Sequence, residues 1–492
     1  MATDGMADRI AIGPRSAGTA YGEFGARVRR AAAFLVGLPG DKIGLIDVNS
    51  DAVPLALFSS VAVGKPYVPV NYRLTDAQLV QIVRRMAPAT VVVGDGIADR
   101  IGDIEGIALV ERKKLLDIAA DNSAPQIGAM TCEPDDIAVL LFTSGTTGEP
   151  KAAILRHRHL AGYILSSVEF AGADETDAAL VSVPPYHIAG VSAVLSNTYN
   201  GRRVIYLEVF DPAEWVRLIE QERITHAMVV PTMLGRILDV VEATGADLST
   251  LRALSYGGGP MPLPVIERAI RVLPGVGFVN AYGLTETSST IAVLGPEDHR
   301  EAFASDDPAV RARLASVGRP LPALEVSIRD EIGDPLPAGE RGEIWVRGEQ
   351  VSGEYLTHRV VNDEGWLPTR DAGTLDEGGY LFVHGRLDDV IVRGGENLSP
   401  GEIEAVLLEH PGVAEAAVLG LPDQEWGEKV VAVVVPETGA TLQETALQDH
   451  VRARLRSTRT PEAIQFRTAL PYSETGKLLR RVLRKELGEF LS

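Results

Sequence analysis

The chain has 492 residues, with 47 lysines and arginines against 67 aspartates and glutamates, so its formal charge is −20. This acidic balance argues against nucleic acid or an anionic membrane as the main partner. Hydrophobic residues make up 45% of the chain and charged residues 23%, which is ordinary for a globular protein and excludes extensive disorder. A lone Cys132 excludes an internal disulfide framework and fits a reducing compartment. No secretory signal and no membrane-spanning apolar run is visible, so we expect a cytoplasmic protein.

Short β-branched runs alternate with helical patterns over most of the chain, which predicts an α/β fold with much parallel sheet. The first buried strand is expected at Lys42–Val48. Thr75 is expected to cap a helix that carries four apolar side chains on one face: Leu79, Ile82, Val83 and Met86. Further strands are predicted at Ala89–Val93, Ile137–Phe142, Ala178–Val183, Val204–Leu207 and Thr225–Val230.

The pattern changes near Gly318. Strands at Glu325–Arg329 and Glu343–Arg347, separated by a Gly/Pro-rich turn, predict a small antiparallel β subdomain. Beyond Asp388 a compact α+β pattern follows, with its elements at Pro400–Glu409, Val413–Leu419, Val430–Val435 and Leu442–Leu455. We therefore predict a large N-terminal domain of parallel and mixed sheets with packed helices over residues 1–387. A small C-terminal α+β domain is predicted over residues 388–492.

The segment Arg452–Lys485 carries ten basic and two acidic residues, a net charge of +8 on an acidic protein. Two interpretations stay open for this cluster. It is either a solvated helix face or a cationic surface that faces phosphates.

Five motifs carry residues suited to nucleotide chemistry. The first follows the predicted strand Ile137–Phe142 and reads Thr143-Ser144-Gly145-Thr146-Thr147-Gly148-Glu-Pro-Lys151. Its glycines let the backbone approach an anion, and its hydroxyls and amides can donate to phosphate oxygens. A flexible turn is the alternative interpretation.

The second motif is Asn280-Ala281-Tyr282-Gly283-Leu-Thr285-Glu286, where an aromatic ring can stack on a base and a carboxylate can hold Mg²⁺. The third is Tyr256-Gly257-Gly258-Gly259-Pro, where a flat ligand could lie against the backbone. A capped strand end and a plain loop are the respective alternatives.

The fourth motif pairs Asp371 with Arg386. A carboxylate can accept from both hydroxyls of a ribose, and an arginine can balance nearby charge; a salt bridge at a turn is the alternative. The fifth is Pro471–Arg480, in which Lys477 follows a glycine within the basic segment. An ordinary exposed lysine is the alternative there.

The order and spacing of the five motifs resemble the adenylate-forming superfamily, which includes acyl- and aryl-CoA synthetases, luciferases and carrier-protein adenylation domains. The resemblance extends from Pro69 to Lys477, and the stretches Arg393–Glu404 and Pro422–Gly427 are most similar to acyl- and aryl-CoA ligases. It implies that the C-terminal domain is mobile and carries the catalytic lysine. Arg370 stands where the family usually has glycine, and the N-terminal helical extension of the family is expected to be missing.

The resemblance implies a role for each motif. The first would form the loop around the pyrophosphate end of ATP, with Thr143, Ser144, Gly145, Thr146, Thr147, Gly148 and Lys151. The adenine would be held by Gly257, Gly258, Gly259, Asn280, Ala281, Tyr282 and Gly283. Thr285 would contact the α-phosphate and Glu286 would bind Mg²⁺.

The remaining implied roles concern the ribose, the lysine and CoA. Asp371 and Arg386 would bind the ribose, and Lys477 would bridge the carboxylate and the α-phosphate. Asp388 would be the hinge between the domains. Gly394 and Gly395 would line the tunnel for the pantetheine arm of CoA.

By the resemblance, the segment Pro184–Gly190 occupies the place that flanks the acyl pocket in the family, and the residues expected at this pocket are Tyr186, His187, Ile188, Gly190, Val191 and Val230. His187 resembles the aromatic gate beside the carboxylate and is counted as catalytic with Lys477, Glu286 and Thr285; a packed core histidine is the alternative. Relatives that activate amino acids place an aspartate early in this segment, and none stands here. No arginine appears in these segments, so we expect a fatty or aromatic acid.

These observations predict an ATP-dependent acid–CoA ligase that uses ATP, Mg²⁺ and coenzyme A on an apolar carboxylic acid. The main alternative is a stand-alone adenylation enzyme that loads an acyl carrier protein in trans. A non-catalytic nucleotide-binding protein is disfavoured by the joint presence of Glu286, Asp371 and Lys477. We expect no nucleic-acid partner and no integral membrane segment.

Overall fold

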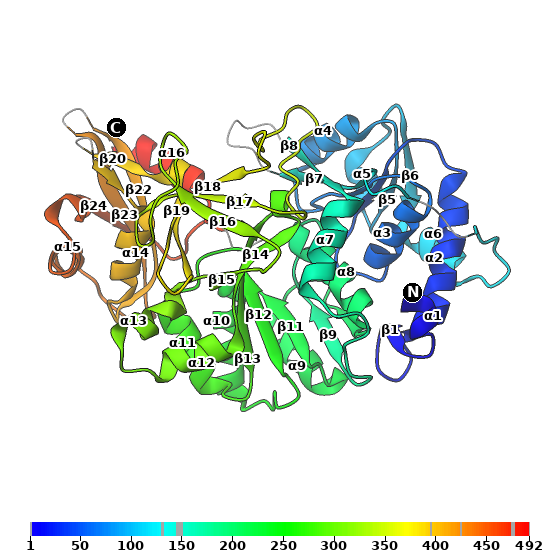
Figure 1. Cartoon of the computed structure of the whole chain (residues 1–492), viewed down its shortest axis with the longest axis horizontal. Coiled ribbons are helices and arrows are strands. Elements are labelled where there is room, and N and C mark those ends of the chain that lie inside the picture. Colours follow the sequence, from blue (N-terminus) through cyan, green and yellow to red (C-terminus); the bar gives the residue numbers. More distant parts are fainter. Residues whose placement is uncertain are drawn as a thin grey trace.

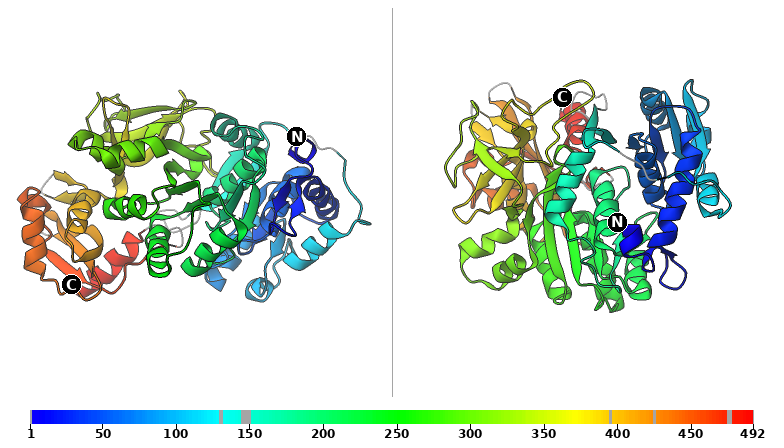
Figure 2. Two further views of the ribbon diagram at one scale, coloured as in Figure 1. Left: turned by 90° about the horizontal axis from the view of Figure 1, so that it is seen from below. Right: turned by 45° about the vertical axis from the view of Figure 1, so that its right-hand side comes forward.

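The computed structural model describes residues 2–128, 132–143, 151–393, 396–423, 426–473 and 478–491. Its elements form four sheets with helices packed between and around them (Figure 1). The blue-to-cyan N-terminal part and the orange-to-red C-terminal part lie at opposite ends of the long axis, as Figure 2 also shows. The predicted fold class is confirmed.

A nine-stranded sheet forms the centre of the molecule. In spatial order its strands are β15 (Arg319–Pro320), β14 (Ser289–Leu294), β13 (Gly277–Leu284), β12 (Ala253–Gly257), β11 (His226–Val229), β9 (Ala178–Val181), β10 (Arg203–Tyr206), β1 (Ile10–Ile12) and β2 (Thr19–Ala20). The run from β13 to β1 is parallel, and antiparallel strands extend it at both edges. Its largest core cluster includes Trp215 and Tyr256, packed with helices α9 (Pro212–Glu222), α10 (Pro231–Thr244) and α11 (Leu263–Val272).

A six-stranded sheet lies toward the N-terminal end. Its strands run β6 (Ile107–Glu111), β5 (Ala89–Val93), β3 (Ile43–Ile46), β4 (Tyr67–Pro69), β7 (Ile137–Thr143) and β8 (Lys151–Arg156). Only the β7–β8 pair is antiparallel. The helices in this part of the chain are α1 (Ala2–Gly5), α2 (Tyr21–Val36), α3 (Ala52–Ala62), α4 (Asp76–Met86), α5 (Ile97–Ile101), α6 (Arg112–Ala120), α7 (His157–Ser167) and α8 (Ile188–Asn200).

Helix α4 shows how local sequence sets an element. Its N-cap Thr75 accepts a hydrogen bond from the backbone of Gln78, whose side chain in turn accepts from the Thr75 backbone, which completes a capping box. The four apolar residues expected on one face are the four buried residues of the helix. Here the sequence-based prediction is confirmed residue by residue.

The N-terminal segment differs from the prediction. Helices α1 and α2 and strands β1 and β2 all precede the strand expected first, so a helical segment is present there. Helix α2 buries Gly25, Arg30 and alanines beside Tyr21 and Phe24. Small and charged residues on the buried face weaken its amphipathic pattern, and the helix is hard to recognise for that reason.

The β subdomain is a four-stranded antiparallel sheet of β16 (Glu325–Arg329), β17 (Gly342–Arg347), β18 (Leu367–Leu375) and β19 (Leu381–Arg386). Before it come helices α12 (Pro296–Ala304) and α13 (Pro308–Arg311) and the 3₁₀ turns η1 (Thr285–Thr287) and η2 (Ala312–Ala315). The turn η3 (Leu387–Asp389) follows β19, at the boundary predicted between residues 387 and 388.

The C-terminal α+β domain has five strands, β20 (Ile391–Arg393), β21 (Glu396–Leu398), β22 (Val413–Asp423), β23 (Gly427–Pro436) and β24 (Ala463–Phe466). Helices α14 (Pro400–Leu408) and α15 (Glu444–Arg452) belong to it, together with the turn η4 (Ser457–Arg459) and helix α16 (Arg480–Leu491). The long hairpin β22–β23 has one core cluster with α14 and α15 and a second with α16. Both predicted strands of this hairpin are present and are longer than expected.

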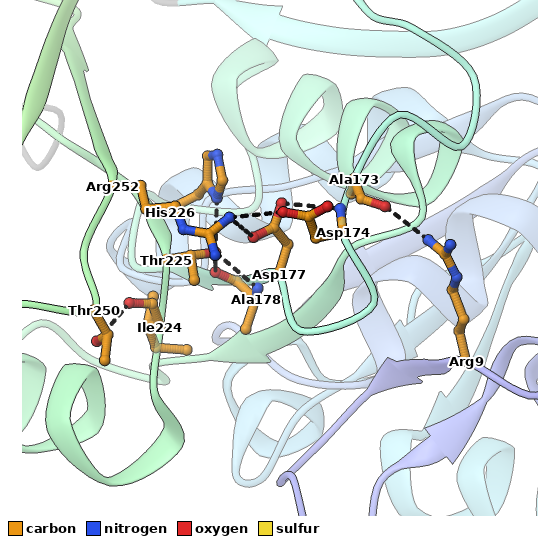
Figure 3. A network of polar contacts seen from close by, with 10 residues as sticks. All are labelled: Arg9, Ala173, Asp174, Asp177, Ala178, Ile224, Thr225, His226, Thr250 and Arg252. Carbon is orange, nitrogen blue, oxygen red and sulfur yellow. Dashed lines mark hydrogen bonds and ion pairs between the residues drawn. The ribbon is translucent and has the colours of Figure 1, made fainter.

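A polar network ties together the starts of the central strands (Figure 3). The Arg252 guanidinium donates to Asp174 Oδ2 at 2.9 Å and to Asp177 Oδ1 at 3.0 Å, and Thr225 Oγ1 accepts from the Ala178 backbone at 3.0 Å. These residues lie at the amino ends of β9, β11 and β12. Ligands of parallel α/β sheets bind beyond the carboxyl ends, so this network is structural and the opposite edge is where a site is expected.

Candidate active site

Two of the glycine-containing motifs meet at the carboxyl edge of the central sheet. Strands β12 and β13 are parallel neighbours with Tyr256 opposite Asn280 and Gly257 opposite Ala281. A Cβ at Gly257 would come within 2.3 Å of the Ala281 carbonyl oxygen, so a side chain cannot be placed there. The Asn280 amide donates to the Ser316 carbonyl at 3.1 Å. The structure therefore brings Gly257–Gly259 and Asn280–Gly283 together, as the adenine prediction requires.

A hydrogen-bonded cluster of Tyr282, Asp371 and Arg386 joins the central sheet to the β subdomain. Tyr282 donates its hydroxyl to Asp371 Oδ2 at 2.6 Å, and Arg386 Nε lies 3.0 Å from Asp371 Oδ1. Asp371 is only 5% exposed. Burial and the neighbouring Asp371 charge raise the pKa of Tyr282 well above its usual range, so the phenol stays protonated as a donor. The second and fourth motifs thus form one constellation, which we call the Asp371 cluster.

Glu286 lies in η1, directly after Thr285. Tyr355 donates its hydroxyl to Glu286 Oε1, and the backbone N–H groups of Ser352 and Gly353 donate to the Glu286 carbonyl at 2.8 and 3.3 Å. Burial and the Glu286 charge raise the pKa of Tyr355. Glu286 is half-buried, and all three of these donors come from the loop between β17 and β18. Tyr355 belongs to the site and escaped the sequence analysis.

The Glu286 carboxylate fits a magnesium site completed by a nucleotide. Among the residues that the structure describes, no group of three or more His, Cys, Asp or Glu side chains is arranged to hold a metal ion. Mg²⁺ in nucleotide enzymes is commonly bound by one or two carboxylates, water and the substrate phosphates, so a single carboxylate in this position meets the requirement.

His187 and Tyr186 form a tilted aromatic pair before helix α8. The ring centroids of Tyr186 and His187 are 4.7 Å apart, and Tyr186 meets the edge of Tyr72 at 5.8 Å. Burial lowers the pKa of His187 to about 4, so the imidazole is neutral near pH 7. A Cβ at Gly190 would lie 2.6 Å from the Pro184 carbonyl oxygen, which accounts for the glycine in this turn. His187 therefore offers a neutral ring rather than a positive charge.

A cavity of about 170 Å³ lies beside this aromatic pair. It is lined by Asn49, Tyr72, Arg73, Ser182, Pro184, Pro185, Glu208, Phe210, Val230, Thr232, Met233, Arg236 and Ser473. Of the six residues expected to form the acyl pocket, Val230 lines this cavity, whereas Val191 packs in the core of the six-stranded sheet. Asn49 is 3% exposed, and its Oδ1 has no hydrogen-bond partner among the described residues. The cavity is thus mixed in character, and two arginines from outside the predicted acyl-pocket residues, Arg73 and Arg236, lie at its wall.

Arg370 and the expected hinge Asp388 are bonded to each other. The Arg370 guanidinium lies 2.6 Å from Asp388 Oδ1, and the backbone φ of Arg370 is +63°. Glycine adopts this left-handed region without strain, which explains why a glycine is usual at the position. The arginine that stands in place of the expected glycine thus forms an ion pair with the residue expected to be the hinge.

Several expected site residues lie outside the described part of the chain: Ser144, Gly145, Thr146, Thr147, Gly148, Gly394, Gly395 and Lys477. For Thr143 the structure gives the backbone, which pairs with Lys151 at the end of β7. The roles of Thr143 and of the expected site residues outside the described part stay predictions.

Half of the ten basic residues in the segment 452–485 form ion pairs in the described part of the chain. Five of its arginines pair with carboxylates: Arg452 with Asp449, Arg454 with Glu409, Arg459 with Glu402, Arg467 with Glu486 and Arg480 with Glu404. The pairs of Arg452, Arg454, Arg459 and Arg467 are at least partly exposed and favour the interpretation as a solvated surface, whereas the pair of Arg480 with Glu404 is largely buried. In the described ranges, no helix has both the length and the apolar character of a membrane span.

Two family models match the chain. The model for the AMP-binding enzyme covers residues 2–356, and the model for the AMP-binding enzyme C-terminal domain covers residues 402–477. The chain is 33% identical over 485 residues to a feruloyl-CoA synthase from Amycolatopsis, covering 96% of this chain and 95% of that protein. It is 33% identical over 461 residues to a fatty acid–[acyl-carrier-protein] ligase from Streptomyces coeruleorubidus, covering 91% and 86%.

A solved structure shares the fold. The o-succinylbenzoate CoA synthetase from Bacillus subtilis in complex with its acyl-adenylate intermediate superposes with a TM-score of 0.83 at 29% identity, over 98% of this chain and 96% of that chain. The same synthetase has been solved with ATP and a magnesium ion. The chain therefore belongs to the AMP-binding enzyme family of the adenylate-forming superfamily, and within it to the AMP-forming acid–thiol ligases.

Proposed function

We propose that this protein is an ATP-dependent acid–CoA ligase with domains at residues 1–387 and 388–492. A carboxylate oxygen attacks the α-phosphorus of ATP, the bond to the bridging oxygen breaks, and pyrophosphate leaves. The thiol of CoA, as its thiolate, then attacks the acyl carbon, and AMP leaves. The Asp371 cluster at the carboxyl edge of the central sheet is the observation that carries this proposal.

The cluster suits a ribose. Tyr282 and Arg386 contact different oxygens of the Asp371 carboxylate, and a carboxylate oxygen can accept more than one hydrogen bond. The two ribose hydroxyls can therefore donate to it while Tyr282 and Arg386 hold it in place. Gly258 and Gly259, which follow β12 and are exposed or half-exposed, leave the backbone open to the adenine, and Thr285, directly before Glu286, would contact the α-phosphate.

The first step brings two anions together, so the site must neutralise charge. Lys477 supplies an ammonium at the reacting oxygens. Magnesium, held by Glu286 and the phosphates, would supply further positive charge when bound. The relative solved with ATP and magnesium ion supports this assignment.

Glu286→Gln tests the metal assignment. The substitution keeps the shape and removes one negative charge, so the Mg²⁺ concentration for half-maximal adenylation should rise by about tenfold or more. Pyrophosphate release is measured across a magnesium titration. Tyr355→Phe is the matched control, because it removes the partner of Glu286 and leaves the carboxylate charge; its magnesium requirement should move much less. An unchanged titration for Glu286→Gln would contradict the assignment.

We further propose that the acid has a largely apolar body, fatty or aromatic. A neutral His187 beside Tyr186, together with Val230 and Met233 at the cavity wall, supports this class. Similarity to a feruloyl-CoA synthase and to an o-succinylbenzoate CoA synthetase also fits an aromatic acid.

A screen of acids with and without CoA tests the substrate and the acceptor. We expect pyrophosphate release to be fastest with cinnamate-like, benzoate-like or C6–C12 fatty acids, and a thioester to form only when CoA is added. Faster turnover with malonate or an amino acid would sink the apolar assignment. Transfer of the acyl group to a carrier protein, with none to CoA, would instead favour the second candidate. Similarity to a fatty acid–[acyl-carrier-protein] ligase is the observation in its favour.

A further inference from the structure

Two adjacent carboxylates in the linker, Asp388 and Asp389, form ion pairs with arginines of different domains. Asp388 in η3 lies 2.6 Å from the Arg370 guanidinium on β18, in the large domain. Asp389 Oδ2, the next residue, lies 3.8 Å from Arg480 Nη1 at the start of α16, in the small domain. The chain therefore passes between the domains at a point where one carboxylate is bound to each side.

The backbone of Arg370 has a conformation that is unusual for an arginine. Its φ of +63° is a region that non-glycine residues rarely adopt, and its backbone N–H donates to Glu343 Oε1 at 2.9 Å. Glycine would avoid the backbone cost at this position. The Arg370 side chain forms the ion pair with Asp388, which a glycine at this position could not form.

The arrangement seen in the structure places the small domain over the acyl side of the site. Ser473, four residues before Lys477, lines the same cavity as Tyr72, Pro185 and Val230. The Ser399 hydroxyl donates to the His384 carbonyl at 2.7 Å, which joins α14 to β19. In the proposed function this is the arrangement for adenylate formation, because the C-terminal domain reaches the cavity proposed for the acid through Ser473.

We infer that Arg370 is a positioning residue that stabilises the adenylate-forming arrangement of the two domains by clamping Asp388. The inference rests on the proposed function, in which the small domain turns about the linker between the half-reactions. Turning changes the backbone at Asp388 and so separates the pair. Arg370 therefore sets the balance between the two arrangements, whereas the neighbouring Asp371 and Arg386 bind the nucleotide.

The two half-reactions measure this balance. An exposed ion pair of this kind changes an equilibrium by roughly two- to fivefold. Arg370→Gly should therefore lower the ratio of the adenylation rate to the rate of thioester formation from preformed acyl-adenylate by about that factor. Arg370→Lys, which keeps the charge, should retain most of the ratio. High salt should lower the ratio in the wild-type enzyme and not in Arg370→Gly, because salt screens exposed charges.

Arg347→Ala is the matched control. It removes a half-exposed arginine from a pair with Glu325 in the same sheet, with Arg347 Nη2 2.6 Å from Glu325 Oε2, and it also removes the contact of Arg347 with the Trp366 ring. Its ratio of rates should stay at the wild-type value. A reduction that is equal in Arg347→Ala and Arg370→Gly would show a general effect on the sheet and overturn the inference.

A measurement without substrates separates this inference from the proposed function. With Cys132→Ser as background, spin labels at two exposed alanines, Ala243→Cys on α10 and Ala453→Cys after α15, report the distance between the domains. Arg370→Gly should broaden the distance distribution or move it from that of the parent, and Arg370→Lys should not. Identical distributions for all three would overturn the inference, even if no acid on the panel were activated. A broadened or shifted distribution for Arg370→Gly alone would support the inference, even if no acid on the panel were activated.

Discussion

Lys477→Ala is expected to slow acyl-adenylate formation by about 10²-fold or more, the scale of removing one preorganised charged group from a transition state. The reason is that the attacking carboxylate and the α-phosphate are both anionic, and the ammonium is assigned to the space between them. ATP–pyrophosphate exchange in the presence of the best acid measures this step. Since Lys477 lies outside the described residues, its role depends on the sequence motif alone.

The second half-reaction provides the internal control for Lys477. Starting from preformed acyl-adenylate, the same variant should make thioester at nearly the normal rate, because the domain that carries the lysine has turned away. Lys485→Ala, a substitution at an exposed lysine of α16, should leave both half-reactions intact. If Lys477→Ala slowed both steps equally, domain alternation would be the wrong description, and Lys477 would be a general binding or stability residue.

Asp371→Asn is expected to raise the KM for ATP by about 10- to 10²-fold, since hydrogen bonds to a charged group contribute about 1.5–3 kcal/mol. The asparagine can still accept from Tyr282 through one oxygen. It loses the charge that holds Arg386, and its amide nitrogen cannot accept from a ribose hydroxyl. Calorimetric titration with ATP checks the loss of affinity directly.

Asp363, an exposed carboxylate on the turn before β18, provides the control substitution for Asp371. Asp363→Asn should bind ATP as the parent does. Thermal unfolding of both variants distinguishes a binding effect from a folding defect, because Asp371 is buried and its loss also costs stability. Unchanged ATP affinity in a folded Asp371→Asn protein would remove Asp371 from the ribose site and weaken the proposed function.

Features set by neighbouring residues were predictable from the sequence. Helix α4 begins at its Thr75 cap and buries the four expected residues, and β16 has the predicted bounds, Glu325–Arg329. The pairing of Asp371 with Arg386 is also local, because the hairpin of β18 and β19 places them opposite each other. Such contacts depend on capping, periodicity and turn geometry, which short stretches of sequence encode.

The contacts between sheets were not predictable in the same way. Tyr282 and Asp371 are 89 residues apart, and Glu286 and Tyr355 are 69 apart. Their meeting depends on how the β subdomain packs against β13 and η1, which no local pattern specifies. Arg236 reaches the cavity from α10, a segment whose sequence resembles an ordinary amphipathic helix. The clamp between Arg370 and Asp388 likewise requires the backbone angle at Arg370 to be known.

The two halves of the binding surface arise from different strands. The cavity proposed for the acid has Pro184 from the loop after β9 and Val230 from the loop after β11 among its lining residues, whereas the residues proposed for the nucleotide lie on or next to β12, β13, β18 and β19. A substitution in either loop can therefore reshape the space for the acid without disturbing the register of strands that align Asp371. This separation allows natural variation, or a designed library confined to two loops, to change the acid while the machinery that consumes ATP is inherited unchanged.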